Sequence, residues 1–197
     1  MDADIKIPAV GAAGSNFNGN KPKVISNCII PLPIDKICDV FSCVNDKTAS
    51  QSIALLDLIE LVENPSKLPK LQAACIAPHT AGVKTKEGVL THNSMNFHWV
   101  DIDSGDKSLD ELQAKLTELG ITSAIIHSTS SSMRIDTNTN QLNGKKWRIL
   151  IPLFSPIECV KWVALQIKLA DKFDGDKSAT RVHQILFAPN NPPINDD

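Results

Sequence analysis

The chain has 197 residues, and its hydrophobic content of 42% is enough to bury one sizeable core, alone or with a smaller satellite. The formal net charge is −2, so any surface that binds nucleic acid must be a local basic one. Tyrosine is absent, which excludes every mechanism with a tyrosine nucleophile, including that of rolling-circle replication initiators.

Cysteine usage and hydropathy indicate the cellular compartment. The five cysteines are an odd number without a CxxC spacing, so we expect reduced thiols rather than a zinc site or a disulfide framework. No apolar run approaches about 18 residues, and the N-terminus has no signal-peptide pattern. We therefore expect a soluble, cytoplasmic protein without a membrane partner.

The first half of the chain has the less distinct pattern. Residues 1–22 are rich in Gly, Ala, Asn and Pro, which predicts a flexible N-terminal arm. Residues 23–92 predict an N-terminal α/β module. It contains a short strand within 23–32, a helix over 34–44 from its apolar spacing, and a core-facing helix over 49–63.

The second half begins with a strand, a helix and another strand. An apolar run predicts the first strand over 95–102. Ser108 and Glu111 form a capping box, and the helix that they open ends at Gly120. A second strand is predicted over 123–127.

A polar loop then leads to a strand, a helix and a last strand. The loop is rich in Ser, Thr, Asn and Gly and covers 128–144, and the third strand covers 146–153. A second capping box at 155–158, with Pro at its first helical position, predicts a helix that ends near 173. A short fourth strand is expected over 184–187.

The order β-α-β-β-α-β predicts an α+β fold, in which a ferredoxin-like (RRM- or palm-like) catalytic module spans 93–192. With right-handed crossovers, strands one and two are parallel and strand three lies antiparallel between them. Strand four then lies on the far side of strand one. Residues 193–197 have the composition of a linker or tail.

Asp101 and Asp103 are the first candidate site. Residues i and i+2 of a strand point to one face, so both carboxylates project together at the end of a buried strand. Such a pair is costly to assemble without a cation, and its hard oxygen atoms suit Mg²⁺ or Mn²⁺. The alternative is an Asp pair that caps a turn.

The predicted topology brings further polar groups to the same rim. They are hydroxyls at Ser128, Thr129, Ser130, Ser131 and Ser132, bases at Lys145, Lys146 and Arg148, and acids at Asp174 and Asp176. Three acids would suit a two-metal phosphoryl-transfer centre, with Arg and Lys neutralising a triphosphate. The alternatives are a polar hairpin loop, an exposed ion-paired arginine and a turn-capping aspartate.

Four motifs in this order resemble the archaeo-eukaryotic primase superfamily. They are VDID, IIHSTSSS, KKWRILIPL followed by Ser-Pro and a helix, and FDGDKS with HQILFAPN. Together they cover about residues 95–192, half of the chain. The similarity is closest to the primase or primase-polymerase domains of phage and plasmid replication proteins.

The resemblance implies one primase-type domain that makes primers on single-stranded DNA by two-metal nucleotidyl transfer from NTPs or dNTPs. It makes Asp101, Asp103 and Asp176 the ligands of two Mg²⁺ or Mn²⁺ ions, with Asp174 competing for the third place. It also implies a fused or separate replicative helicase as partner, a further C-terminal domain after 193–197, and the host cytoplasm as location if the protein is viral. The implied nucleotide-binding residues are Ser128, Thr129, Ser130, Lys146, Arg148 and His127.

One position departs from the family. Ser130 stands where the family has a His that helps to bind the nucleotide. His127 would replace it through a local bulge, and His183 lies just before the fourth strand. The departure leaves a second hypothesis open, a catalytically weak or inactive primase-like domain that binds nucleic acid as an initiator.

Two further classes share a DxD motif. A HAD-type phosphotransferase would have a parallel doubly wound sheet, and a DxD glycosyltransferase would have more parallel strands, so the predicted element order disfavours both. Template contacts are weakly marked in the sequence, and a solvated surface is the alternative for each. The candidates for a basic track are Lys21, Lys23, Lys84, Lys86, Lys145 and Lys146.

Overall fold

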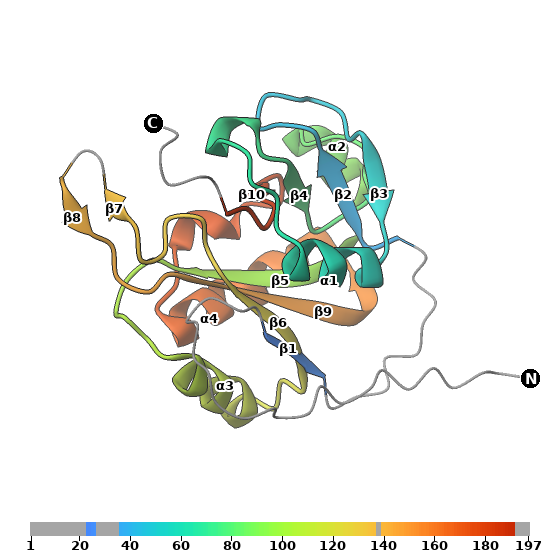
Figure 1. Ribbon diagram of the computed structural model, residues 1–197. Coiled ribbons are helices and arrows are strands. Elements are labelled where there is room, and N and C mark those ends of the chain that lie inside the picture. The colour runs from blue at the N-terminus through green and yellow to red at the C-terminus, as the bar shows by residue number, and fades with distance from the viewer. Residues whose placement is uncertain (1–22, 27–35, 137–138, 192–197) are drawn as a thin grey trace, which may run out of the picture.

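A computed structural model describes residues 23–26, 36–136 and 139–191. The predicted arm over 1–22, the end of the predicted first strand and the predicted tail over 193–197 lie outside these ranges. The described chain forms two four-stranded sheets and a small hairpin, with helices on both sides of the larger sheet (Figure 1). This is a mixed α+β fold, as predicted.

The first sheet has the order β1-β6-β9-β5, and β9 runs antiparallel to both β5 and β6. The three central strands and their arrangement confirm the prediction for strands one to three. The added edge strand comes from the N-terminal segment and pairs with β6. The bounds are β1 (Lys23–Ser26), β5 (Met95–Ile102), β6 (Ser123–Ser128) and β9 (Trp147–Ile157).

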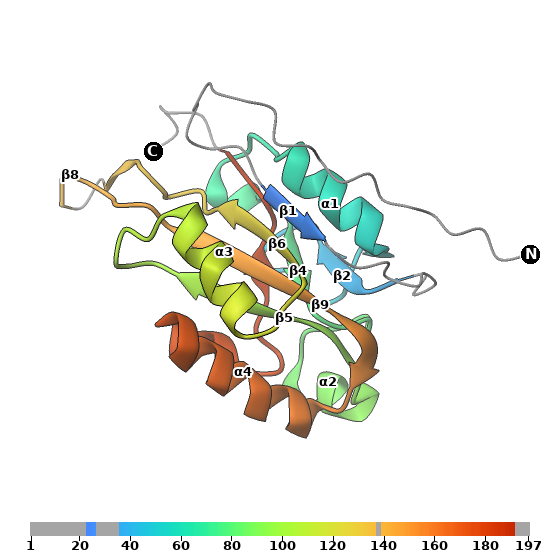
Figure 2. The ribbon, with the colours of Figure 1, turned by 90° about the horizontal axis from the view of Figure 1, so that it is seen from below.

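The second sheet has the order β10-β4-β2-β3, and a two-stranded hairpin projects to one side of the molecule (Figures 1 and 2). The bounds are β2 (Cys38–Phe41), β3 (Gln51–Ile53), β4 (Cys75–Ala77) and β10 (Leu186–Phe187), with β7 (Ile135–Asp136) and β8 (Gln141–Leu142) in the hairpin. The helices are α1 (Leu55–Glu63), α2 (Lys86–His92), α3 (Leu109–Glu118) and α4 (Cys159–Phe173), with 3₁₀ turns η1 (Lys70–Gln72) and η2 (Lys177–Thr180).

The first sheet separates two hydrophobic cores. On one face, Val100 and Ile102 of β5 pack with Leu112 and Leu116 of α3. On the other face, Trp99 belongs to the core shared with α1 and the second sheet. Figures 1 and 2 show α3 and α4 on one side of the first sheet and the second sheet on the other. Alternation along β5 therefore assigns each residue to one of the two layers.

The prediction that residues 184–187 lie beside strand one is wrong. β10 pairs instead with β4 in the second sheet, Leu186 opposite Ile76. The outer edge of β5 is already occupied, because Trp162 Nε1 of α4 donates to the carbonyl of Phe97 at 2.8 Å and Gln166 Nε2 donates to that of Trp99. A fourth strand has no free carbonyls to pair with there, so the ferredoxin-like order is not formed.

The two predicted modules exchange one strand each. β1 from the N-terminal module completes the first sheet, and β10 from the end of the chain completes the second. The predicted boundary near residue 92 is thus crossed in both directions. The exchange brings the segment after β10 against the site end of the first sheet.

The prediction of a helix over 34–44 is wrong. Residues 38–41 form β2, which pairs with β3 on one side and β4 on the other. All four residues of β2 are buried. A strand covered on both faces shows no alternation, so its apolar spacing imitates that of a helix. The helix predicted over 49–63 is in turn a short strand followed by α1.

The α3 capping box is confirmed, whereas the second capping box is wrong. Ser108 Oγ accepts from the Glu111 amide at 3.2 Å, and Glu111 Oε2 accepts from the Ser108 amide at 2.6 Å. The segment 155–157 instead continues β9, and α4 begins at Cys159. Pro156 is tolerated there because this part of β9 has a partner strand on one side, β5.

Two properties bear on the sequence-based expectations. Within the ranges that the structure describes, no helix has the length and apolar character needed to cross a membrane. The described cysteines Cys38, Cys43, Cys75 and Cys159 are free thiols.

Candidate active site

Asp101, Arg148 and His127 form one row across three strands. Asp101 on β5 lies directly opposite Arg148 on β9, which lies directly opposite His127 on β6. Directly opposed residues of neighbouring strands project to the same face. Because Trp99 and Asp101 alternate with Val100, this face is the one turned toward the second sheet. Three side chains that are far apart in the sequence therefore meet between the two sheets.

Arg148 holds Asp101 and also connects the two sheets. Its Nε donates to Asp101 Oδ1 at 2.6 Å and its Nη2 to Asp101 Oδ2 at 2.9 Å, a bidentate pair. Its Nη1 donates to the carbonyl of Phe187 on β10 at 2.6 Å. The two charged side chains are 11% and 17% exposed, so the pair is largely shielded from solvent.

The row lines a cavity of about 190 Å³ between the sheets. Asp103 and the hydroxyl run 128–131 contribute to the same walls, and Lys70 and residues 187–190 contribute from the second-sheet side. A smaller cavity of about 70 Å³ adjoins it and shares His127 and residues 128–130. Most of the site residues predicted from the sequence thus lie around one cleft.

Asp103 and Lys146 extend the charged part of the cleft toward solvent. Asp103 is 58% exposed, and its Oδ1 lies 4.0 Å from Lys146 Nζ. The two carboxylates differ in their surroundings, since Asp101 is engaged by a guanidinium group and Asp103 is open to a ligand. The predicted placement of both acids on one face at the strand end is confirmed by the cavity that they share.

Asp176 is close to this site through its backbone, while its carboxylate has a different partner. Its amide donates to the Asp101 carbonyl at 2.8 Å, but its carboxylate accepts from the Ser178 amide at 2.8 Å and from Ser178 Oγ at 2.5 Å. These two hydrogen bonds lower the pKa of Asp176. Asp176 therefore caps η2 in this structure, and its role as a third metal ligand stays a prediction.

Asp174, the competing candidate, points away from the cleft. It ends α4 in a left-handed conformation with φ of 55°. Its side chain is 88% exposed and lies 4.0 Å from Lys107 Nζ.

Asp101 and Asp103 fit a divalent cation that is shared with a substrate. Mg²⁺ in such sites is held by one or two carboxylates together with substrate phosphates and water, which matches two acids on the wall of one cavity. In the described part of the chain, no group of three or more His, Cys, Asp or Glu side chains is placed to hold a metal ion by itself. The acids therefore fit an ion that arrives with its substrate better than a permanently bound one.

His127 is the imidazole that reaches the cleft. It is only 4% exposed, and its Nδ1 lies 2.9 Å from the carbonyl of Ser128. Burial lowers its pKa to about 4, with a further contribution from the positive charge of Arg148. The ring is therefore neutral at physiological pH. His183, the other candidate, lines neither of the two cavities.

Sequence reasoning missed Lys70. This residue opens η1, lines the larger cavity, and places its Nζ 5.3 Å from the centre of the Phe187 ring. Asn190 ties the neighbouring segment to the end of β10, since its Oδ1 accepts from Ser66 Oγ at 2.7 Å and its Nδ2 donates to the Leu68 carbonyl at 2.8 Å. A single lysine in a segment without a clear pattern gave no local signal for this position.

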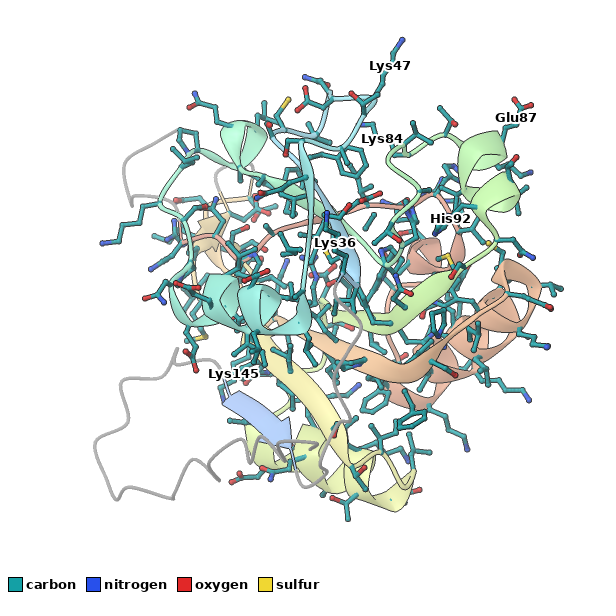
Figure 3. The ribbon with its side chains drawn as sticks, turned by 90° about the vertical axis from the view of Figure 1, so that its right-hand side faces the viewer. Lys36, Lys47, Lys84, Glu87, His92 and Lys145 are labelled. Atoms are coloured by element: carbon teal, nitrogen blue, oxygen red, sulfur yellow. The ribbon has the colours of Figure 1, made fainter. Side chains whose placement is uncertain are left out.

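The lysines considered for a basic track do not all belong to one surface. Figure 3 shows Lys84 near Lys47 at the second-sheet end of the molecule and Lys145 well apart from them. Lys84 Nζ contacts the Val44 carbonyl and lies 5.7 Å from the centre of the Phe41 ring. Lys84 therefore has a local structural role.

Comparisons with known proteins give one similarity. No family model matches the chain, and no curated protein matches it. Among solved structures, the chain is similar to the AEP domain of the primase-polymerase (PrimPol) of cyanophage S-2L, with 13% sequence identity and a TM-score of 0.42. The match covers 78% of this chain and 72% of that one. A similarity of this size carries no functional inference, so the site geometry has to supply it.

Proposed function

We propose that this chain is a nucleotidyltransferase domain of the primase-polymerase type, which extends nucleic acid on a single-stranded DNA template from NTPs or dNTPs. The observation that carries the proposal is the row Asp101–Arg148–His127 at the wall of one cleft. Acids that suit a divalent cation, bases that suit phosphates and a run of hydroxyls converge there. Phosphoryl transfer needs this combination of groups.

Each group has a role that follows from its charge. Asp101 and Asp103 would hold Mg²⁺ or Mn²⁺, with Asp176 as the third ligand once it leaves Ser178. The bound ions would neutralise phosphate charge and activate the attacking 3′-hydroxyl. Lys146, Lys70 and the hydroxyls of 128–131 would orient the triphosphate so that the hydroxyl oxygen attacks the α-phosphorus and pyrophosphate leaves.

Arg148 takes part in both charge states of the cleft. Its bidentate contact keeps the Asp101 carboxylate paired in this structure. When a cation binds Asp101, the guanidinium group loses its partner and becomes available to the phosphate oxygens that arrive with the cation. Arginine matches phosphate geometry as well as carboxylate geometry, so the same side chain serves both partners.

Primer synthesis on single-stranded DNA with labelled nucleotides tests the proposal. Wild type should give Mg²⁺- or Mn²⁺-dependent products, and Asp101→Asn and Asp103→Asn should lower the yield on the order of 100-fold or more. Glu118→Gln is the matched control, because this acid is on α3 and pairs with Lys115 on the same helix. Equal product from the wild type and both aspartate variants would rule the proposal out.

The second candidate is a non-catalytic domain that binds single-stranded nucleic acid, for instance within a replication initiator. The observation in its favour is that Asp101 and Asp176 are both engaged with protein partners, Arg148 and Ser178. It predicts binding of single-stranded DNA without nucleotide incorporation under any metal condition. A fused or separate helicase is a partner that the sequence resemblance suggests for both candidates.

A further inference from the structure

Two buried polar atoms without a hydrogen-bond partner lie in the wall between the two cavities. They are His127 Nε2 and Thr129 Oγ1. Both residues line the larger and the smaller cavity. A buried polar atom that lacks a partner is costly, so a pair of them at a cleft indicates the groups that a ligand would bring.

The hydrogen bond at Nδ1 determines what His127 can accept. The Ser128 carbonyl can only accept, so Nδ1 carries the ring proton. Nε2 of the neutral ring then has a lone pair and no proton, and it needs a donor. Ionised phosphate oxygens are acceptors only and cannot satisfy it. The partner of Nε2 is therefore a hydroxyl or an amino group rather than a phosphate.

Thr129 adds a second hydroxyl-sensing group beside the histidine. Its backbone is held in place, because its amide donates to the Lys146 carbonyl at 3.0 Å. Its free hydroxyl both donates and accepts. Two neighbouring hydroxyls on a ligand, such as those of a ribose, satisfy a lone acceptor and an adjacent hydroxyl together.

The position of this pair relative to the charged groups selects the part of the nucleotide. Asp101, Asp103 and Arg148 line the larger cavity and not the smaller one, whereas Arg134 and Asn191 line the smaller one. Phosphates placed at the charged end leave the sugar, the next group along the nucleotide, at the shared wall. We propose that His127 and Thr129 form a subsite for the sugar hydroxyls and make the cleft selective for ribonucleoside triphosphates, an inference that rests on the proposed function.

A nucleotide that lacks these hydroxyls would leave His127 Nε2 unpaired in a buried site. Sites built to pair with a substrate hydroxyl reject the analogue without it much more strongly than apolar pockets reject an added group. We expect the wild type to bind ATP about 10-fold or more tightly than 2′,3′-dideoxy-ATP, with 2′-deoxy-ATP and 3′-deoxy-ATP between them.

Equilibrium binding of these four nucleotides, measured with the full chain and Mg²⁺, tests the subsite. His127→Leu and Thr129→Val should bring the ratio of the ATP and dideoxy-ATP dissociation constants close to one, mainly by weakening ATP. Ser131→Ala is the control that should keep the wild-type ratio, since Ser131 lines the larger cavity alone. Thermal unfolding checks each variant, and Thr129→Val decides the question if His127→Leu does not fold.

The outcomes separate this inference from the proposed function. If the wild type binds ATP and dideoxy-ATP equally, or if both variants keep the wild-type ratio, the subsite is refuted while nucleotide binding stands. If the wild type binds none of the four nucleotides, the proposed function and the subsite fail together.

Discussion

Arg148 and Asp101 lie directly opposite each other on β9 and β5, joined by hydrogen bonds of 2.6 and 2.9 Å. The guanidinium group makes a third contact across the cleft, to the Phe187 carbonyl. The carboxylate best placed for a cation is thus engaged by the cation-like side chain of the protein itself. A metal ion and Arg148 compete for the same two oxygens, and this competition can be measured.

Replacing Arg148 should change metal and nucleotide affinity in opposite directions. Arg148→Gln removes the competitor, so Mn²⁺ binding without nucleotide should tighten about tenfold, while ATP binding should weaken by a similar factor. Electron paramagnetic resonance of free Mn²⁺ and calorimetry of ATP binding measure the two effects. Arg181→Gln is the control, because Arg181 contacts Ser178 and Gln184 outside the cleft. Parallel changes in both affinities would contradict the competition.

Asp176 has two roles that one substitution can separate. Asn caps helical turns about as well as Asp but carries no charge, so Asp176→Asn should leave the melting temperature unchanged. If the carboxylate also serves as the third metal ligand, nucleotide incorporation should fall on the order of 100-fold. Asp174→Asn, at an 88% exposed side chain, should alter neither quantity. Full activity of Asp176→Asn would restrict this residue to capping η2.

His127 should make the protein less stable in acid. Its pKa in the folded protein, about 4, lies below its ordinary value of 6.5, so the unfolded chain binds the proton more readily. The stability that the neutral ring contributes is present above pH 6.5 and is lost as the pH falls toward 4. Between pH 7 and pH 4.5 the loss amounts to about 2–3 kcal/mol.

Urea unfolding at the two pH values, for the wild type and His127→Leu, checks this prediction. The leucine variant should lose less free energy of unfolding between pH 7 and pH 4.5, because the other titrating groups are common to both proteins. Equal losses in the two proteins would show that the ring is not held neutral by its burial.

Gly175 allows the turn after α4 to approach β5. A Cβ atom at this position would lie 2.5 Å from Val100 Cγ1 and 3.0 Å from the Asp101 carbonyl oxygen. Gly175→Ala should therefore lower the free energy of unfolding by about 1–3 kcal/mol and displace the strand end that carries Asp101. Gly144→Ala is the matched control, since its nearest atom, Asp106 Oδ1, is 3.7 Å away. Urea denaturation of both variants measures the difference.

The sequence by itself determined the features that depend on neighbouring residues. The capping box of Ser108 and Glu111 and the end of α3 at Gly120 follow from contacts within one turn of helix. The shared face of Asp101 and Asp103 follows from the two-residue period of a strand. Local periodicity needs no knowledge of the partner strands, and these predictions therefore agree with the structure.

The tertiary structure decided which segments meet. Trp162 and Gln166 occupy the outer edge of β5, which sends β10 to the second sheet and brings its end over the cleft. That placement gives Arg148 its third partner and brings Lys70 to the cavity wall. It depends on competition between a helix and a strand for the same backbone carbonyls, distant in sequence, and no local pattern records which of them wins.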